Sequence, residues 1–270
     1  MPSTSEVAEI LRKRYEWLPY LAESELTKPE LCDRIDVSRS TVDRGVSELE
    51  SAEIVDRTAN GYQLTAFGDL LCQLRKSYLR SLETIYRAQG MQTPLPTDQY
   101  GEQILFDGGD VVLPEPHLPE KPTRRILSLI TDSRAVYGLT PVMHDQYVST
   151  SYEQVMMHDL EFEFLITSQI FDGLVSLYSE WLINAFQRDA FVIYECQQLP
   201  PFGLAIFERK SDGSHTVVLA LYADNGLSGI IENDTRKAVG WAKQLYRDYR
   251  EAATHIDTDY VRKTLNQERP

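Results

Sequence analysis

The segment from residue 28 to residue 65 constrains this chain more than any other, because four local patterns follow one another there. Leu31 and Ile35 lie on one face of a predicted helix, and Thr27 stands before it as an N-cap. After a short turn, Ser38 is a suitable N-cap for a second helix. The segment therefore predicts two short helices joined by a tight turn.

The second predicted helix has one apolar and one polar face. Val42, Val46 and Leu49 repeat at helical spacing and should face a core. The opposite face carries Arg39, Ser40, Asp43 and Arg44. Two short β-prone runs follow, residues 54–58 and 62–65. They are joined through Asn60-Gly61, a strong hairpin signal because both residues tolerate positive φ.

Helix, turn, helix and hairpin in this order predict a winged helix-turn-helix, whose second helix fits the major groove of DNA. The side chains expected to contact bases or phosphates lie on the two helices, at the N-cap of the second helix, and on the hairpin. They are Arg34, Ser38, Arg39, Ser40, Thr41, Arg44, Arg57, Asn60 and Tyr62. Such units also occur in proteins that bind protein instead of DNA, and docking on a transcription factor is the alternative function.

A long helix is predicted from residue 65 to about residue 88. Its apolar residues are spaced by three and four, close to a heptad seam: Phe67, Leu71, Leu74, Tyr78, Leu82 and Ile85. The seam either packs on its own N-terminal domain or forms a homodimer. We favour the dimer, because it would place two recognition helices on one face of a two-fold symmetric DNA site.

Charge argues against simple DNA binding, because the chain carries a net charge of −14. Residues 1–90 hold 12 Lys or Arg against 15 Asp or Glu, whereas residues 91–270 hold 15 against 26. The predicted DNA-binding part is thus the less acidic part. Molar intracellular salt would reduce the repulsion, since the Debye length falls to about 3 Å at 1 M. The other reading is that the unit does not bind DNA.

Several classes of protein are disfavoured by composition. The N-terminus is polar and acidic, unlike a signal peptide, and no apolar run is long enough to span a bilayer. Cys32, Cys72 and Cys196 are far apart and form no paired motif, which favours reduced thiols over disulfides or a zinc site. We therefore expect a cytoplasmic protein.

Four regions are predicted along the chain. The N-terminal domain covers residues 1–90 and is α+β. Residues 91–122 are rich in proline and glycine and read as a linker, with short strands at 104–106 and 111–113. Strands alternate with helices over residues 123–256, which predicts an α/β domain ending in a helix at 233–256. Residues 257–270 form a polar tail.

The second domain offers a candidate ligand site. Pockets in α/β sheets open at the carboxyl ends of strands. Polar residues follow the predicted strands at Tyr137, Ser168 and Tyr194, and Asn233 stands where a strand gives way to a helix. These four residues are the predicted ligand contacts, although an N-cap role explains Asn233 better.

Taken together, the two predicted domains resemble those of archaeal transcription regulators. Residues 1–90 resemble winged-helix domains of the ArsR and MarR type. Residues 111–256 resemble the C-terminal domain of methanogenesis-regulator-type transcription factors, and the acidity is similar to that of haloarchaeal members. The matching segments are VVLPEPHLPEKP (111–122), VYGLTP (136–141), LPPFGL (199–204), and Asn233-Asp234 followed by AVGWAKQLYRDY (238–249). The resemblance implies a DNA-binding regulator whose second domain senses a small molecule or mediates assembly.

Catalytic motifs are absent from the sequence. Phospholipase-D-type chemistry needs a His followed two residues later by Lys, and none of the five histidines has one. There is no P-loop ending and no G-x-S-x-G elbow. His144-Asp145 and His158-Asp159 are isolated pairs that fall short of a metal site. We expect no catalysis, no cofactor and no bound metal.

Overall fold

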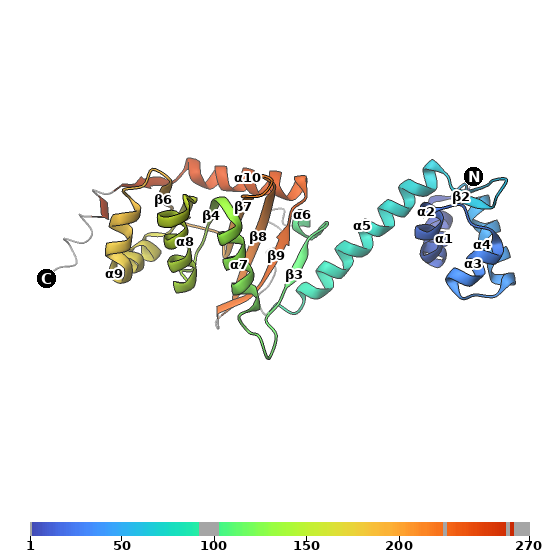
Figure 1. Cartoon of the computed structure of the whole chain (residues 1–270), viewed down its shortest axis with the longest axis horizontal. Coiled ribbons are helices and arrows are strands. Elements are labelled where there is room, and N and C mark those ends of the chain that lie inside the picture. Colours follow the sequence, from blue (N-terminus) through green and yellow to red (C-terminus); the bar gives the residue numbers. More distant parts are fainter. Residues whose placement is uncertain (1, 92–102, 224–225, 258–259, 262–270) are drawn as a thin grey trace. The chain divides into compact units, whose positions relative to one another are not determined.

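The computed structural model describes residues 2–91, 103–223, 226–257 and 260–261. The chain divides into two compact units, residues 1–80 and 81–270, and the boundary falls within helix α5 (Ala66–Ala88) (Figure 1). Within the described residues, no helix combines the length and the apolarity needed to cross a membrane.

The first unit is mostly helical with one small hairpin. Its elements are α1 (Thr4–Arg14), the 3-10 turn η1 (Tyr15–Trp17), α2 (Leu18–Glu23), α3 (Lys28–Ile35), α4 (Arg39–Ser51), β1 (Val55–Arg57) and β2 (Tyr62–Leu64), followed by α5. Its core contains Trp17, Leu31, Val42, Val46 and Leu49, all buried. The apolar face of α4 thus packs against the other helices of the first unit and forms the centre of its core.

The hairpin differs from the two-residue turn that the Asn-Gly pair predicts. Residues 58–61 connect β1 to β2, and Thr58 N donates to Gly61 O at 2.8 Å. Asn60 does not adopt a positive φ, and its amide N donates to the Thr58 hydroxyl at 3.2 Å. Gly61 is required for space, because a Cβ there would lie 2.5 Å from Leu26 O.

The second unit is built on one eight-stranded sheet with the order β10-β6-β5-β4-β7-β8-β9-β3. Its strands are β3 (Asp110–Val112), β4 (Ser133–Leu139), β5 (Glu161–Ile166), β6 (Phe191–Glu195), β7 (Phe202–Arg209), β8 (His215–Ala223), β9 (Gly226–Asn233) and β10 (Thr254–Ile256). Its helices are α6 (Gln103–Phe106), α7 (Lys121–Asp132), α8 (Asp145–His158), α9 (Ser168–Ala185) and α10 (Arg236–Glu251). Strands β4, β5 and β6 are parallel, and the other pairs are antiparallel.

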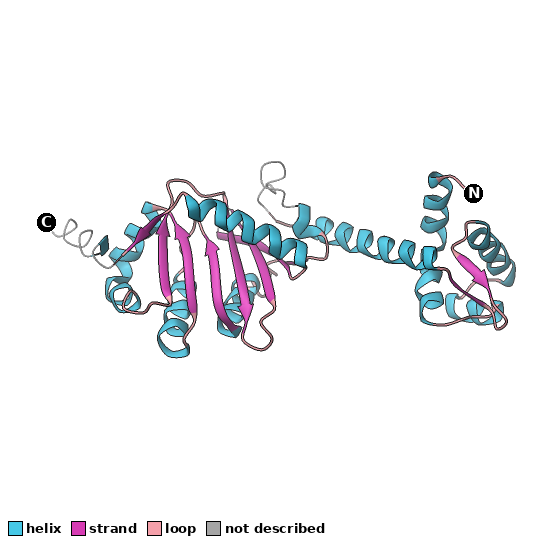
Figure 2. Ribbon diagram, turned by 90° about the horizontal axis from the view of Figure 1, so that it is seen from above, coloured by secondary structure: helices cyan, strands magenta, loops and turns pink. Residues whose placement is uncertain are grey.

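Helices cover both faces of the sheet. Helix α10 lies on one face, and α7, α8 and α9 lie on the other (Figure 2). Side chains alternate between the faces along each strand, so Phe162 and Phe164 face α7–α9 whereas Glu163 faces α10. The sheet therefore separates two distinct packed layers.

Residues 103–112 correct the predicted linker. Residues 103–106 form α6, not a strand, and β3 is an edge strand of the sheet, paired with β9. Leu105 and Val111 are buried in the layer beneath α10, which explains why this segment belongs to the second unit. Helix α7 begins at Lys121, within the predicted linker, and residues 92–102 of that prediction lie outside the described residues.

The end of the chain also differs from the prediction. The final helix stops at Glu251, and residues 254–256 pair with β6 as β10. Most of the predicted polar tail lies outside the described residues, but Val261 within it is fully buried against the α9 layer. Apolar burial thus extends past the predicted end of the domain.

Candidate nucleic-acid interface

Two capped helices and a left-handed turn set the geometry of the first unit. Thr27 and Glu30 form a capping box at the start of α3, and Ser38 Oγ accepts from Thr41 N at 3.3 Å at the start of α4. Between the helices, Asp36 ends α3 with φ 56°. Asp tolerates this conformation better than most residues, so the short turn forms without glycine.

Helix α4 presents a polar surface opposite its buried face. Arg39, Ser40 and Arg44 are exposed, whereas Val42 and Val46 on the other side are buried. Among the described residues, no ion pair involves Arg39 or Arg44. Both guanidinium groups are therefore available to an external acceptor.

An ion pair between α3 and α4 reduces the acidity of this surface. Lys28 Nζ lies 2.8 Å from Asp43 Oδ1, and this hydrogen bond lowers the pKa of Asp43. The Lys28 ammonium also lies 5.8 Å from the centre of the Tyr62 ring. Lys28 was not among the predicted site residues, because a contact fifteen positions apart leaves no local signal.

The remaining predicted DNA contacts divide into exposed and occupied groups. Arg57 and Asn60 are exposed on the hairpin, and Arg34 is exposed beside the Tyr20 ring. The Ser38 hydroxyl caps α4 and contacts the Thr41 hydroxyl at 2.9 Å, so these two groups serve the turn. They hold the start of α4 in place.

Tyr62 corrects the prediction. Its side chain is only 7% exposed and packs in the core of the first unit. Its backbone pairs with Leu26 on one side and with Arg57 on the other. A ring held in this way cannot turn outward to a phosphate, so Tyr62 supports the hairpin from inside.

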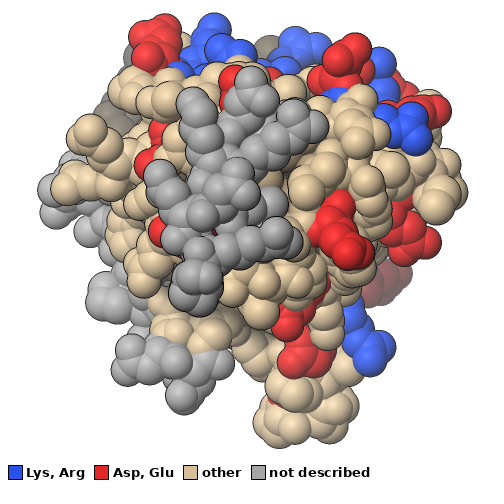
Figure 3. Space-filling view, turned by 90° about the vertical axis from the view of Figure 1, so that its left-hand side faces the viewer, with Lys and Arg blue, Asp and Glu red and all other residues tan. Residues whose placement is uncertain are grey.

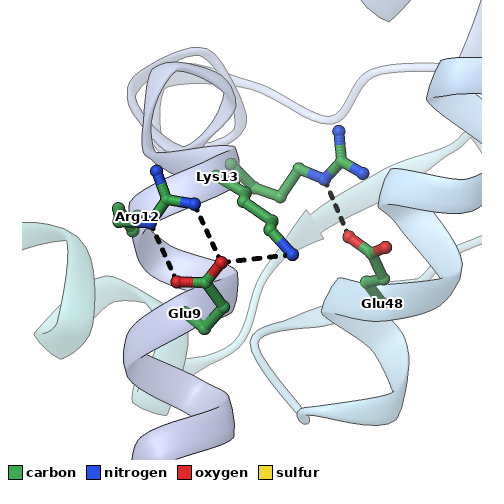
Figure 4. A network of polar contacts seen from close by, with 5 residues as sticks. Glu9, Arg12, Lys13 and Glu48 are labelled. Atoms are coloured by element: carbon green, nitrogen blue, oxygen red, sulfur yellow. Dashed lines mark hydrogen bonds and ion pairs between the residues drawn. The ribbon is translucent and has the colours of Figure 1, made fainter.

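A second basic group in the same unit is neutralised internally. The Glu9 carboxylate forms ion pairs with Arg12 Nε at 2.8 Å and with Lys13 Nζ at 3.2 Å (Figure 4). Arg14 Nε pairs with Glu48 Oε2 at 2.9 Å. The hydrogen bonds from Arg12 and Lys13 lower the pKa of Glu9 to about 2. The positive charges of Arg12, Lys13 and Arg14 are therefore balanced by carboxylates of α1 and α4.

The predicted seam of α5 is largely exposed. Phe67, Leu74, Tyr78, Leu82 and Ile85 are between 45% and 65% exposed, whereas Leu71 packs against the core of the first unit. Of the six seam residues, only Leu71 packs against the core of the first unit, so the prediction that the whole seam packs there is wrong.

The four predicted ligand contacts do not converge. Tyr137 and Tyr194 lie on the α10 face, where their hydroxyls meet Glu161 and Arg250 respectively. Ser168 is the exposed first residue of α9. Asn233 is buried, and its amide nitrogen donates to Leu105 O at 2.9 Å and Asp107 O at 3.0 Å.

Asn233 also departs from the reading as an N-cap. Thr235 caps α10, since its hydroxyl accepts from Ala238 N, and Asn233 Oδ1 accepts from Thr235 N at 2.8 Å. Asn233, the last residue of β9, therefore links this strand to α6 and the residues that follow it through hydrogen bonds. This role depends on a contact 128 residues away, which no local pattern reveals.

Two of the three cysteine thiols are buried. Cys72 and Cys196 are buried, and burial raises the pKa of both thiols. No group of three His, Cys, Asp or Glu side chains suited to a metal ion occurs in the part of the chain that the structure describes. On the face of the second unit shown in Figure 3, acidic and basic side chains are interspersed among uncharged ones.

Two family models match this chain. Residues 119–252 match the middle domain of the methanogenesis regulatory protein FilR1, and residues 5–87 match the HVO_A0261 N-terminal domain. No curated protein matches the sequence. The match to the FilR1 middle domain supports a role in transcription regulation.

Solved structures resemble the chain only loosely. TrmBL2, an archaeal chromatin protein described as having a novel mode of DNA binding, is 12% identical over 94% of this chain and 100% of its own, with a TM-score of 0.43. Nuc of Salmonella typhimurium, a phospholipase D family member, is 10% identical over 56% and 99%, with a TM-score of 0.43. NucT from Helicobacter pylori is 12% identical over 55% and 98%, with a TM-score of 0.41. At these scores the likenesses carry no argument about function.

Proposed function

We propose that this protein is a sequence-specific DNA-binding transcription regulator whose first unit acts as a winged helix-turn-helix. The observation that carries the proposal is that Arg39 and Arg44 are exposed on the face of α4 opposite its buried side and form no ion pair with another described residue. Helix α4 would enter the major groove, and Arg57 and Asn60 on the hairpin would contact the flanking backbone. Each bidentate Arg–guanine contact would contribute about 1–3 kcal/mol of discrimination.

The test is the double substitution Arg39→Ala with Arg44→Ala. A binding site is first recovered by selecting sheared genomic DNA of the source organism with the purified protein in molar KCl. The double variant should bind that site at least about 10-fold more weakly, as expected for the loss of one or two base contacts. Calorimetry or fluorescence anisotropy measures the affinity.

The matched control is Arg12→Ala with Lys13→Ala. The control also removes two positive charges from the first unit, but these belong to side chains that are already paired with Glu9. Equal weakening by both variants would show that only net charge matters. Unchanged binding by the Arg39 and Arg44 variant would remove α4 from the interface.

One observation favours a second candidate, a protein-interaction module that docks on a transcription factor. The net charge of −14 opposes approach to DNA. The salt response distinguishes the two functions, because phosphate contacts release counterions and DNA affinity then falls as salt rises. If the genomic selection enriches no sequence, the docking function replaces the DNA-binding one.

The proposed regulator acts as a homodimer in the cytoplasm of a halophilic archaeon. The exposed apolar residues of α5 supply the dimer contact, and the second unit senses a small molecule or mediates assembly. No catalytic step is assigned to either unit, because no His-x-Lys pair, P-loop or nucleophile elbow is present in the sequence.

A further inference from the structure

A cavity of about 120 Å³ lies in the second unit between the sheet and helices α7, α8 and α9. Phe162 and Phe164 of β5, Ala220 of β8 and Ile126 of α7 contribute to its wall. It lies on the sheet face opposite α10, away from the predicted ligand contacts Tyr137 and Tyr194. Its surface is almost wholly apolar.

Two polar atoms, His144 Nδ1 and the Tyr147 hydroxyl, lie in this otherwise apolar wall. His144 Nδ1 and the Tyr147 hydroxyl are two of the three buried side-chain polar atoms without a regular hydrogen bond in the described part of the chain. Their rings lie 4.8 Å apart, centre to centre, at the start of α8. The Tyr147 hydroxyl can hydrogen-bond with Thr123, so His144 Nδ1 is the stronger evidence for a polar atom that needs a partner.

The position of His144 explains why its ring is available. His144 is the N-cap residue of α8, but its side chain makes no capping hydrogen bond. Buried polar atoms are rarely left without a partner, because the loss of water is then uncompensated. A polar group brought in by a ligand would supply the partner that the protein does not.

Charge restricts the ligand to a neutral molecule. Among the described residues that line the cavity, none is Lys, Arg, Asp or Glu. Neither a carboxylate nor an ammonium ion would meet a permanently charged side chain of opposite sign among these residues, and burial of such an ion is strongly unfavourable. Burial also raises the pKa of Tyr147, so its hydroxyl stays protonated and able to donate.

Size restricts the ligand to about one ring. An engineered protein cavity of about 150 Å³ lined by aliphatic and aromatic side chains binds benzene. We propose that this cavity binds a neutral single-ring molecule with one hydrogen-bonding group, held by His144 and Tyr147, and that this molecule is the effector. Binding stands independently of the proposed function, and only the word effector rests on it.

The test uses the full chain and three probes, namely phenol, benzene and benzoate. Thermal unfolding and calorimetry measure binding, because a ligand that prefers the native state raises the unfolding midpoint. Phenol should bind about 10-fold more tightly than benzene, and benzoate should not bind. Benzoate binding as tightly as phenol, or phenol having no effect at millimolar concentration, would overturn the proposal.

Three variants locate the binding. Ala220→Leu fills the cavity and should abolish binding of phenol and benzene alike. His144→Leu and Tyr147→Phe should reduce phenol affinity toward that of benzene while benzene binding persists. The matched controls are His158→Leu and Tyr152→Phe on the same helix, neither of which lines the cavity. If Ala220→Leu does not fold, the His144→Leu comparison decides, and unchanged phenol affinity there contradicts the site.

A separate measurement tests the effector role. Phenol should change the affinity of the wild-type protein for its selected DNA site at least about threefold, and should not do so for His144→Leu. Phenol binding that leaves DNA affinity unchanged would overturn the effector role. DNA binding without phenol binding would overturn the cavity assignment and leave the proposed function standing.

Discussion

At the scale of single residues, Gly45 shows how close packing limits the sequence of helix α4. A Cβ at Gly45 would lie 2.0 Å from an atom of the Trp17 ring, so the ring rests directly on the α4 backbone. Both residues are buried in the core of the first unit. The close approach places the buried side of α4 against η1 and leaves the Arg39 side free.

We predict that Gly45→Ala destabilises the first unit by about 1–3 kcal/mol, as overpacking of a filled core does. Gly240→Ala in α10 is the matched control, because nothing lies within 4 Å of its added Cβ. There the higher helix propensity of alanine should stabilise the second unit by about 0.5–1 kcal/mol. Hydrogen exchange measures each unit separately, and the same sign at both sites would contradict the packing argument.

At the scale of elements, α5 carries an apolar stripe that its own chain leaves exposed. Its C-terminal end is anchored in the second unit, where Thr84 Oγ1 donates to Gly109 O at 2.6 Å and Arg87 donates to Val111 O at 2.6 Å. These bonds fix the part of the helix that carries the exposed residues Leu82 and Ile85. That favours a helix–helix contact with a second copy.

We predict that Leu74→Glu with Leu82→Glu converts a dimer into a monomer, because carboxylates replace apolar seam contacts. Light scattering after size-exclusion chromatography measures the mass. Gln73→Glu with Lys76→Gln is the control, since it changes the net charge by the same amount at exposed positions of the same helix. A wild-type protein that is monomeric at micromolar concentration would exclude the α5 dimer.

Helix α1 gives a pH-dependent prediction. Hydrogen bonds from Arg12 and Lys13 lower the pKa of Glu9 from 4.5 to about 2. A lowered native pKa stabilises the folded state above pH 4.5, and this contribution is lost as pH falls toward 2. The unfolding midpoint of Glu9→Gln should therefore lie below that of the wild type at pH 5 and approach it near pH 2. A difference that stays constant over this range would contradict the linkage.

At the scale of the whole molecule, a net charge of −14 creates repulsion that salt should relieve. We predict that the unfolding midpoints of both units rise between 0.1 and 2 M KCl, because the Debye length falls from about 10 Å to less than 3 Å. Sucrose at equal osmolality controls for preferential exclusion without screening. An equal rise in sucrose would show that charge is not the cause.

The sequence by itself determined the local elements of this protein. Thr27 and Ser38 act through atoms within three residues of themselves, so the starts of α3 and α4 could be read directly. Alternating strands and helices likewise predicted most of the second unit. Signals of this kind need no knowledge of distant contacts.

Only the tertiary structure decided which side chains meet. Tyr62 turned inward because Leu26 and the core surround it, and Asn233 was drawn to the α6 segment more than a hundred residues away. His144 and Tyr147 line one cavity with Phe164 and Ala220, which belong to strands that are far apart in the sequence and lie in the same sheet. Pairing between distant strands depends on the summed burial of many residues, which no short window of sequence contains.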